Sequence, residues 1–159
     1  MVGNVTESVV TLTPMPPSQM AEWSQQLWIA YRADLIKAGS SESEADANIA
    51  RNRESLMPDG EPGPDQHIFN VTLDGEVVGA LWLAERSPGD WFVYDVEIQQ
   101  AHRGHGLGRA AMVAAEGYVR EHGGAKLGLS VFGFNEVARN LYSSLGYQVL
   151  AMNMVKDFT

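Results

Sequence analysis

The chain has 159 residues, 45% of them hydrophobic, no cysteine and a formal net charge of −9. This length fits one domain with its own core, so we expect a single domain spanning residues 1–159. The absence of cysteine excludes disulfides, thiolate metal sites and a cysteine nucleophile. The acidic charge argues against nucleic acid or an anionic membrane as the main partner. No apolar stretch approaches the roughly 20 residues that cross a bilayer, and no basic leader opens the sequence, so we expect a cytoplasmic protein.

The N-terminal part of the sequence predicts one strand and two helices. Residues 5–12 are rich in Val and Thr and predict a strand, which a following group of prolines ends. Apolar residues three and four apart then predict a helix over 18–38, with Ser18 as its N-cap. Ser41 and Glu44 have the spacing of a capping box, which predicts a second helix from about 42 to 57.

Two strands and a tight turn follow a loop over residues 58–66. Asp74-Gly75 is the two-residue signal of a β-hairpin, and it lies between strand-like segments at 67–73 and 76–84. The rest of the chain is expected to contain, in order, a strand over 91–98, a helix to about His122, a strand over 126–132, a helix over 135–145 and a last strand from Tyr147. The hairpin supplies antiparallel pairs and the strand-helix-strand unit a parallel one. We therefore expect an α/β (α+β) fold with a central mixed sheet flanked by about four helices.

A glycine-rich stretch, HRGHGLGRAAM, occupies residues 102–112 between a predicted strand and a predicted helix. A helix start has several N–H groups without a partner, and the helix dipole adds about half a positive charge there. Glycines let a phosphate reach these groups, while Arg103 and Arg109 add positive charge. The stretch therefore predicts a diphosphate site. A tight turn that needs glycine only for its backbone conformation explains it equally well.

Two familiar phosphate loops do not fit this stretch, and neither does a metal site. A P-loop needs a hydroxyl after its basic residue, where this chain has Ala110. The dinucleotide fingerprint needs a third glycine where this chain has Arg109. His102 and His105 have the spacing of a metal pair, but no carboxylate completes a ligand set, so we expect no metal.

Two separated segments resemble one family. Residues 103–108, RGHGLG, resemble the R/Q-x-x-G-x-G/A signature of the GNAT superfamily of N-acetyltransferases. Residues 135–147, NEVARNLYSSLGY, resemble the second segment of that superfamily, N-x-x-A-x-x-L-Y followed by L-G-F/Y. Both occur in the expected order, and the resemblance extends from residue 91 to beyond Tyr147. On these residues the chain is identified as a member of the superfamily, with a GNAT-like fold and acetyl-coenzyme A as acyl donor.

The resemblance implies a set of coenzyme-binding residues. In the family the glycine loop holds the diphosphate, and the corresponding residues here are Arg103, Gly104, His105, Gly106, Leu107, Gly108 and Arg109. The backbone of the preceding strand pairs with the pantetheine arm and stabilises the oxyanion, which implies Val96 to Ile98, with Glu97 and Ile98 as the expected backbone contacts. Asn135 is expected to contact the coenzyme arm, and Tyr142 to lie beside its sulfur.

Two residues are expected to carry the proton transfers. A departing thiolate of pKa about 8.5 benefits from a hydroxyl of pKa about 10 as donor, and Tyr142 is the candidate. Asn135 and Tyr142 are seven residues apart, which places them on one side of a helix. Alternation along the strand puts Trp91, Val93, Asp95 and Glu97 on one face, and Glu97 is the candidate base. A core tyrosine and ordinary solvated carboxylates are the alternatives.

The acceptor is expected to be a primary amine, with a positive charge. Residues 41–65, in the region where the family commonly builds its acceptor pocket, hold 7 Asp and Glu against 2 Arg. The aromatic residues that could wall this pocket are Trp23, Trp28, Tyr31 and Trp82, although Trp23 and Tyr31 fit core positions better. The sequence thus predicts transfer of an acetyl group from acetyl-coenzyme A to an amine of a small molecule or peptide, by direct attack in a ternary complex.

Other classes of function stay open at this stage. The domain could bind acyl-coenzyme A as a sensor without turnover, or dock a basic partner with its acidic face. Dimers are frequent in the family, so a homodimer is a further expectation from the resemblance. Neither nucleic acid nor a membrane is expected as a partner.

Overall fold

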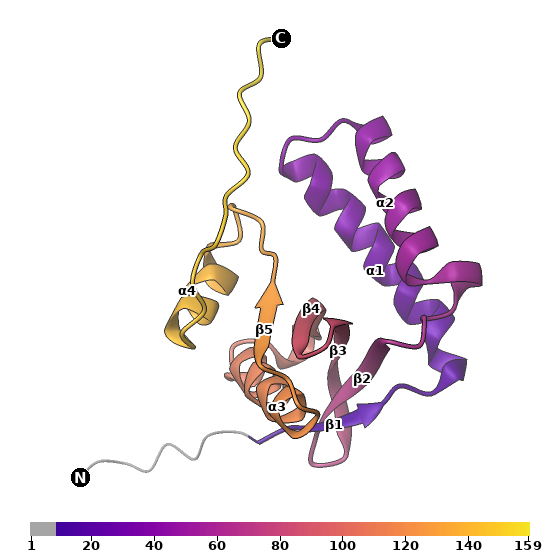
Figure 1. Ribbon diagram of the computed structural model, residues 1–159, viewed down its shortest axis with the longest axis vertical. Coiled ribbons are helices and arrows are strands. Elements are labelled where there is room, and N and C mark those ends of the chain that lie inside the picture. The colour runs from indigo at the N-terminus through magenta and orange to yellow at the C-terminus, as the bar shows by residue number, and fades with distance from the viewer. Residues whose placement is uncertain (1–8) are drawn as a thin grey trace.

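The computed structural model describes residues 9–159, which form one mixed sheet with helices on both faces (Figure 1). The sheet has the order β1-β2-β3-β4-β5, with bounds β1 (Thr11–Pro14), β2 (Gln66–Leu73), β3 (Glu76–Ser87), β4 (Asp90–Ile98) and β5 (Lys126–Leu129). Neighbours from β1 to β4 pair antiparallel, and β4 pairs parallel with β5. The expected mixed sheet is confirmed.

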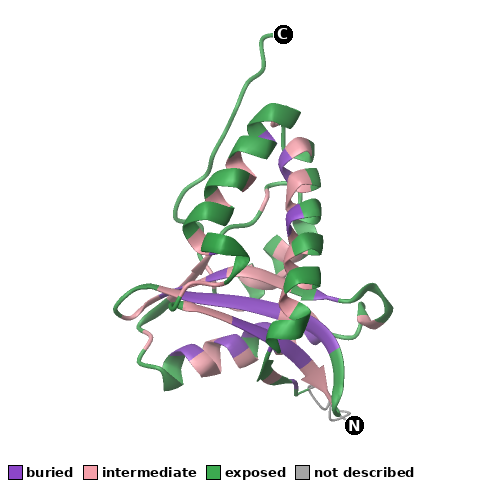
Figure 2. Ribbon diagram, turned by 90° about the vertical axis from the view of Figure 1, so that its right-hand side faces the viewer, coloured by how far each residue is buried: buried purple, intermediate pink, exposed green. Residues whose placement is uncertain are grey.

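The helices divide between the two faces of the sheet (Figure 2). Their bounds are α1 (Pro17–Lys37), α2 (Glu42–Leu56), α3 (Leu107–Glu121) and α4 (Glu136–Ser144), with short 3₁₀ helices η1 (Pro58–Gly60) and η2 (Gln100–His102). One apolar layer lies between the sheet and α3, and includes Leu81, Leu83 and Met112. A second lies on the α1 side around Trp28 and Trp82. Alternation along β3 produces both layers, since Trp82 faces away from its two leucine neighbours.

Two local sequence signals are confirmed. Asp74 and Gly75 both have positive φ, 51° and 82°, as the tight hairpin turn requires. Ser41 caps α2 as a capping box: its N–H donates to the Glu44 carboxylate at 2.8 Å, and its hydroxyl accepts from the Glu44 N–H at 3.2 Å. These contacts satisfy donors that the helix start leaves without an internal partner.

The N-terminal elements differ from expectation at two points. The first strand runs from Thr11 to Pro14 rather than over 5–12, and residues 5–8 lie outside the described part of the chain. Proline is tolerated at its end because β1 is the edge of the sheet. Ser18 is not the N-cap of α1: that position is Pro16, with Pro17 opening the helix. Proline suits the first turn because its missing N–H would have no helical partner there.

The prediction for the last two strands of the sheet is wrong. β5 ends at Leu129 instead of residue 132, and no strand begins at Tyr147. Residues 148–159 are exposed and lead away from the sheet past α4 (Figure 1). Since a strand forms only beside a partner, this segment remains irregular where it lies.

A β-bulge in β4 decides which side chains face the site. Trp82 on β3 lies opposite Asp95, but the next residue, Leu83, lies opposite Val93. Tyr94 is therefore an extra residue without a partner of its own, and the alternation of β4 shifts by one position there.

The expectation that Trp91, Val93, Asp95 and Glu97 share one face is therefore wrong. Trp91 and Val93 belong to the apolar layer beneath α3. Beyond the bulge Asp95 and Glu97 lie on the α1 face, opposite Trp82 and Ala80 in the register. Strict alternation fails because the inserted residue changes its phase.

Candidate functional site

The glycine loop joins η2 to α3 with open space beside it. Gly104 and Gly106 have φ of 81° and 75°, the left-handed region that favours glycine. A Cβ built at either position would meet no atom within 4 Å. The turn therefore needs glycine for its conformation, and the same glycines leave the loop uncovered.

The start of α3 has free hydrogen-bond donors. Gly106 is the N-cap and has no side chain to offer. Within residues 9–159, the N–H groups of Leu107, Gly108 and Arg109 donate to no acceptor. Three unpaired donors at the positive end of a 15-residue helix favour an anion.

The two arginines that flank these glycines are tied to different elements. The Arg103 Nε donates to the carbonyl of Ile98 at 2.9 Å, and its guanidinium lies 3.5 Å from the Glu97 carboxylate. Arg103 thus fixes the loop to the end of β4. The Arg109 guanidinium donates to the hydroxyl of Ser144 on α4. Arg109 therefore lies beside both helix α4 and the free donors of α3.

Strand β4 loses its β5 neighbour next to this loop. The β4–β5 ladder joins Asp90–Val93 to Lys126–Leu129 and ends there, immediately before the bulge. In the described part of the chain, Val96 to Ile98 pair with β3 on one side and with no strand on the other. This edge is the arrangement that the expected pairing with a pantetheine arm requires.

Helix α4 brings the second sequence motif to the first. A Cβ on Gly108 would lie 3.6 Å from a methyl of Leu141, so α4 lies beside the first turn of α3. Asn135 precedes the helix rather than opening it, and its side-chain oxygen caps α4 by accepting from the Ala138 N–H at 3.2 Å. Tyr142 is half-buried against the α3 layer, with its ring centroid 5.9 Å from that of Tyr147.

A buried carboxyl lies close to Tyr142, and sequence reasoning did not select it. The Oδ2 atom of Asp95 is buried, and within residues 9–159 it has no hydrogen-bond partner. Burial, and secondly the charge of Glu97, raise the pKa of Asp95 to about 7. Burial and the charge of Asp95 raise the pKa of Tyr142 above its usual value, which keeps the phenol protonated at neutral pH. The bulge creates this arrangement, and no residue pattern in the strand marks it.

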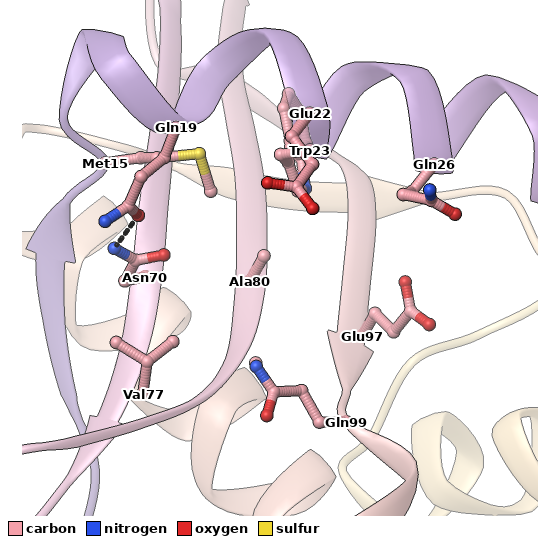
Figure 3. Close-up of a pocket in the computed structure, with 11 residues that line it drawn as sticks. Met15, Gln19, Glu22, Trp23, Gln26, Asn70, Val77, Ala80, Glu97 and Gln99 are labelled. Carbon is pink, nitrogen blue, oxygen red and sulfur yellow. Dashed lines mark hydrogen bonds between the residues drawn. The ribbon is translucent and has the colours of Figure 1, made fainter.

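A pocket of about 380 Å³ opens between α1 and the sheet, and Glu97 forms part of its wall (Figure 3). Glu22, Trp23 and Gln26 line it from α1, and Glu97 lines it from β4. Both of its charged lining residues, Glu22 and Glu97, are acidic. The pocket therefore favours a positively charged group.

Only some of the residues predicted to wall the acceptor pocket line the acidic pocket beside Glu97. Trp28 and Trp82 are core residues, exposed by 7% and 2%, and neither lines the acidic pocket beside Glu97. The acidic residues of α2 do not line the pocket beside Glu97. Asp46 instead lines a separate hollow between α1 and α2, where Arg32 holds it in an ion pair of 2.7 Å. Of the four aromatic candidates, Trp23 is the one in the acidic pocket.

The comparison with known families decides what this arrangement belongs to. The sequence profile of the Acetyltransferase (GNAT) family matches residues 20–147. The chain belongs to the GNAT family. The match includes both motifs and all the residues that line the unpaired edge of β4. Membership predicted from the two motifs is confirmed, and so is the GNAT-like fold.

Named GNAT relatives agree with this assignment. The uncharacterised N-acetyltransferase YdgE of Bacillus subtilis is 32% identical over 121 residues, which cover 74% of this chain and 77% of YdgE. The mycothiol acetyltransferase of Corynebacterium glutamicum is 35% identical over 93 residues, which cover 58% of this chain but only 32% of that protein. The crystal structure of YycN from Bacillus subtilis, described as a candidate acetyltransferase, superposes with a TM-score of 0.87 at 28% identity, covering 95% of this chain and 99% of YycN.

The GNAT assignment makes acetyl transfer the general activity of this fold. Residues 9–159 contain no cluster of three His, Asp or Glu side chains placed to hold a metal ion, and His102 lies 3.5 Å from Glu76. Among the same residues, no helix combines the length and the hydropathy that a membrane crossing requires.

Proposed function

We propose that the protein transfers an acetyl group from acetyl-coenzyme A to the primary amine of a small molecule or peptide, by direct attack in a ternary complex. One observation carries the proposal: the free donors of α3, the unpaired edge of β4 and the Tyr142 phenol lie at one place. The free donors suit a diphosphate, the edge suits an extended amide-containing arm, and the phenol suits a leaving thiolate.

The donor is held by backbone groups in this proposal. The loop from Arg103 to Arg109, including His105, surrounds the diphosphate, and the N–H groups of Leu107 to Arg109 donate to it. The backbone of Val96 and Ile98 pairs with the pantetheine arm, and a strand N–H stabilises the oxyanion of the tetrahedral intermediate. Asn135 contacts the arm with the side-chain nitrogen that its capping role leaves free.

Protons move through two groups on opposite sides of the acetyl carbon. Glu97 accepts a proton from the ammonium in the acidic pocket, so that the free amine attacks. As the carbon–sulfur bond breaks, Tyr142 donates its proton to the thiolate, and the proton that the new amide nitrogen loses restores the phenol. The charge of Glu97 acts on Asp95, and the charge of Asp95 acts on Tyr142, so the three groups are electrostatically coupled.

A cationic acceptor follows from the pocket between α1 and the sheet. Glu22 and Glu97 carry negative charge, and Trp23 offers an aromatic face for a cation. Gln19 and Asn70 hydrogen-bond to each other at 2.9 Å and close the far wall (Figure 3). A compact amine with a second positive charge fits these groups better than an acidic one.

Turnover separates this proposal from a sensor or a docking domain. Incubation of the protein with acetyl-coenzyme A and a panel of mono- and diamines should release free thiol at steady state, fastest with dicationic acceptors. A protein that binds acetyl-coenzyme A tightly but releases no thiol with any amine would instead support the sensor, and the enzyme proposal would fail.

Tyr142→Phe tests the proposed acid. The variant keeps the ring and removes the hydroxyl, so kcat should fall by about ten-fold or more while the dissociation constant for acetyl-coenzyme A changes little. Tyr118→Phe is the matched control, because Tyr118 is a partly buried tyrosine on α3 that stacks on His122 at 3.9 Å. Equal kcat values for the two variants would remove Tyr142 from the reaction.

Glu22→Gln tests the acceptor pocket. Loss of one exposed charge should raise KM for a diamine by about two- to five-fold and leave kcat almost unchanged, since an exposed charge pair contributes at most about 1 kcal/mol. Glu54→Gln, an exposed site on α2, should leave KM as it is. An unchanged KM in Glu22→Gln would place the acceptor elsewhere.

A further inference from the structure

Among the residues that the structure describes, one polar side chain is buried in the sheet. Asn70 on β2 is 7% exposed, and it belongs to the wall of the pocket between α1 and the sheet. Burying a carboxamide costs free energy unless its polar atoms are hydrogen-bonded. An apolar residue would fill the same place in β2 without that cost, so the amide at this position needs an explanation.

Only part of the Asn70 amide is used within the protein. Its Nδ2 donates to the Oε1 of Gln19 on α1 at 2.9 Å, which fixes the orientation of the amide. Within residues 9–159 no group donates to its Oδ1, and this oxygen points toward Ala80, into the pocket (Figure 3). A carbonyl oxygen of this kind accepts hydrogen bonds, so it favours a ligand that brings a donor.

Asn70 and Glu97 lie at the two ends of one row of residues. In the register Asn70 lies opposite Ala80, and Ala80 lies opposite Glu97, so the row crosses β2, β3 and β4 (Figure 3). The middle residue is small, which leaves the space between the two polar side chains open. Glu22 and Trp23 of α1 line the same pocket above Ala80. The row therefore forms a slot with a polar group at each end.

The slot sets the length of a ligand that spans it. Neighbouring strands lie about 4.8 Å apart, so the α-carbons of Asn70 and Glu97 are roughly 10 Å apart. With a hydrogen bond of roughly 2.8 Å at each end, about 5 Å remain between the two ligand atoms that bind these residues. A chain of four carbon atoms between two polar groups spans this distance, and a chain of two carbon atoms does not.

We propose that Asn70 is a specificity-determining residue, which accepts a hydrogen bond from a second donor group of the acceptor substrate while the reacting amine lies at Glu97. The substrate class is a primary amine that carries a hydroxyl or a second amino group about four carbon atoms away. A carboxylate at the far end is disfavoured, because no positively charged side chain of the described residues lines the pocket. The inference rests on the proposed function, since it takes Glu97 as the place of the reacting amine.

Two pairs of amines test the slot. 4-Aminobutan-1-ol and pentylamine have the same length and charge, and a hydroxyl in the first replaces a methyl group in the second. In the thiol-release assay kcat/KM for the amino alcohol should exceed that for pentylamine by about five- to ten-fold, the effect of one hydrogen bond. For 2-aminoethanol and propylamine the ratio should be about one, because the shorter chain does not reach Asn70. A ratio of about one for the longer pair would overturn the proposal.

Asn70→Leu assigns the selectivity to this side chain. Leucine has nearly the same size and no polar atom, and the exposed Gln19 can bind water in place of the lost donor, so the variant should fold. The ratio for the longer pair should fall to about one. Asn52→Leu on α2 is the matched control, because it removes a similar amide–amide hydrogen bond, to Asn48 at 2.7 Å, outside the pocket. An unchanged ratio in Asn70→Leu would mean that its amide only holds α1 to the sheet.

Binding without turnover separates failure of this inference from failure of the proposed function. Isothermal titration calorimetry of the longer amines with the protein alone gives the same comparison as a ratio of dissociation constants. Preference for the amino alcohol in binding, without thiol release from any amine, would retain the slot and overturn acetyl transfer. Turnover of both longer amines with equal kcat/KM would retain acetyl transfer and overturn the slot.

Discussion

Gly106→Asn should weaken the binding of acetyl-coenzyme A by about 100-fold or more while the protein still folds. Two charge-assisted hydrogen bonds to the diphosphate are worth about 1.5–3 kcal/mol each, and 1.4 kcal/mol is ten-fold in affinity. The new side chain would enter the space beside the free N–H groups of α3, which no protein atom now fills. Asn is the right replacement because it tolerates the left-handed conformation that Gly106 adopts, with φ of 75°.

Gly123→Asn separates blocking from strain. Gly123 lies just beyond the opposite end of α3, has φ of 79° and also has no atom within 4 Å of a built Cβ. Gly106→Asn and Gly123→Asn both place Asn in the left-handed conformation, so both lose the same folding free energy. Gly123→Asn should nevertheless bind acetyl-coenzyme A as the wild type does. Isothermal titration calorimetry of the three proteins measures the difference. Wild-type affinity in Gly106→Asn would mean that the loop is a turn and not a diphosphate site.

Asp95→Asn should stabilise the protein in alkaline solution. The folded state holds the pKa of Asp95 at about 7, against an ordinary value of 3.8. Between these pH values the folded state binds one more proton than the unfolded state does. The free energy of unfolding therefore falls as the pH rises from about 4 to 7. At 1.36 kcal/mol for each pKa unit, the buried charge costs about 4 kcal/mol above pH 7, and a neutral amide removes that cost.

Urea unfolding at pH 5 and pH 8, at one protein concentration, measures this effect. The difference in unfolding free energy between variant and wild type should be larger at pH 8 than at pH 5. Asp90→Asn is the control on the same strand, since its carboxylate is partly exposed and lies 3.8 Å from the Lys126 ammonium. If Asp95→Asn changed the unfolding free energy equally at both pH values, ionisation of the Asp95 carboxyl would cost the folded state no free energy, and the prediction would be wrong.

The local signals of the sequence predicted much of the fold. The capping box of Ser41 and the turn at Asp74-Gly75 act within a few residues, so their geometry follows from residue type alone. The two GNAT motifs likewise gave the family without any knowledge of how they meet. Contact between Gly108 and Leu141 shows that α3 and α4 bring them together.

Features set by tertiary partners could not be predicted in the same way. Whether residues after Tyr147 form a strand depends on a neighbouring strand, which sequence patterns do not specify. Trp28 and Trp82 are aromatic residues of the kind that often wall a pocket, but the structure places both of them in the core. The sequence shows Asp95 as one of two carboxylates on a strand, but the burial of its Oδ2 depends on an extra residue whose place nothing in the pattern indicates.

That extra residue, Tyr94, limits how such a site can change during evolution. Upstream of it Trp91 and Val93 pack beneath α3, whereas downstream of it the residues that continue the same alternation, Asp95 and Glu97, lie on the α1 face. If β4 paired with β3 without the bulge and lost no residue, Asp95 and Glu97 would turn into the apolar layer beneath α3, and Val96 and Ile98 would turn to the α1 face. The place of these acidic groups therefore depends on the bulge as much as on residue identity, and a change that straightens β4 would remove them from the site.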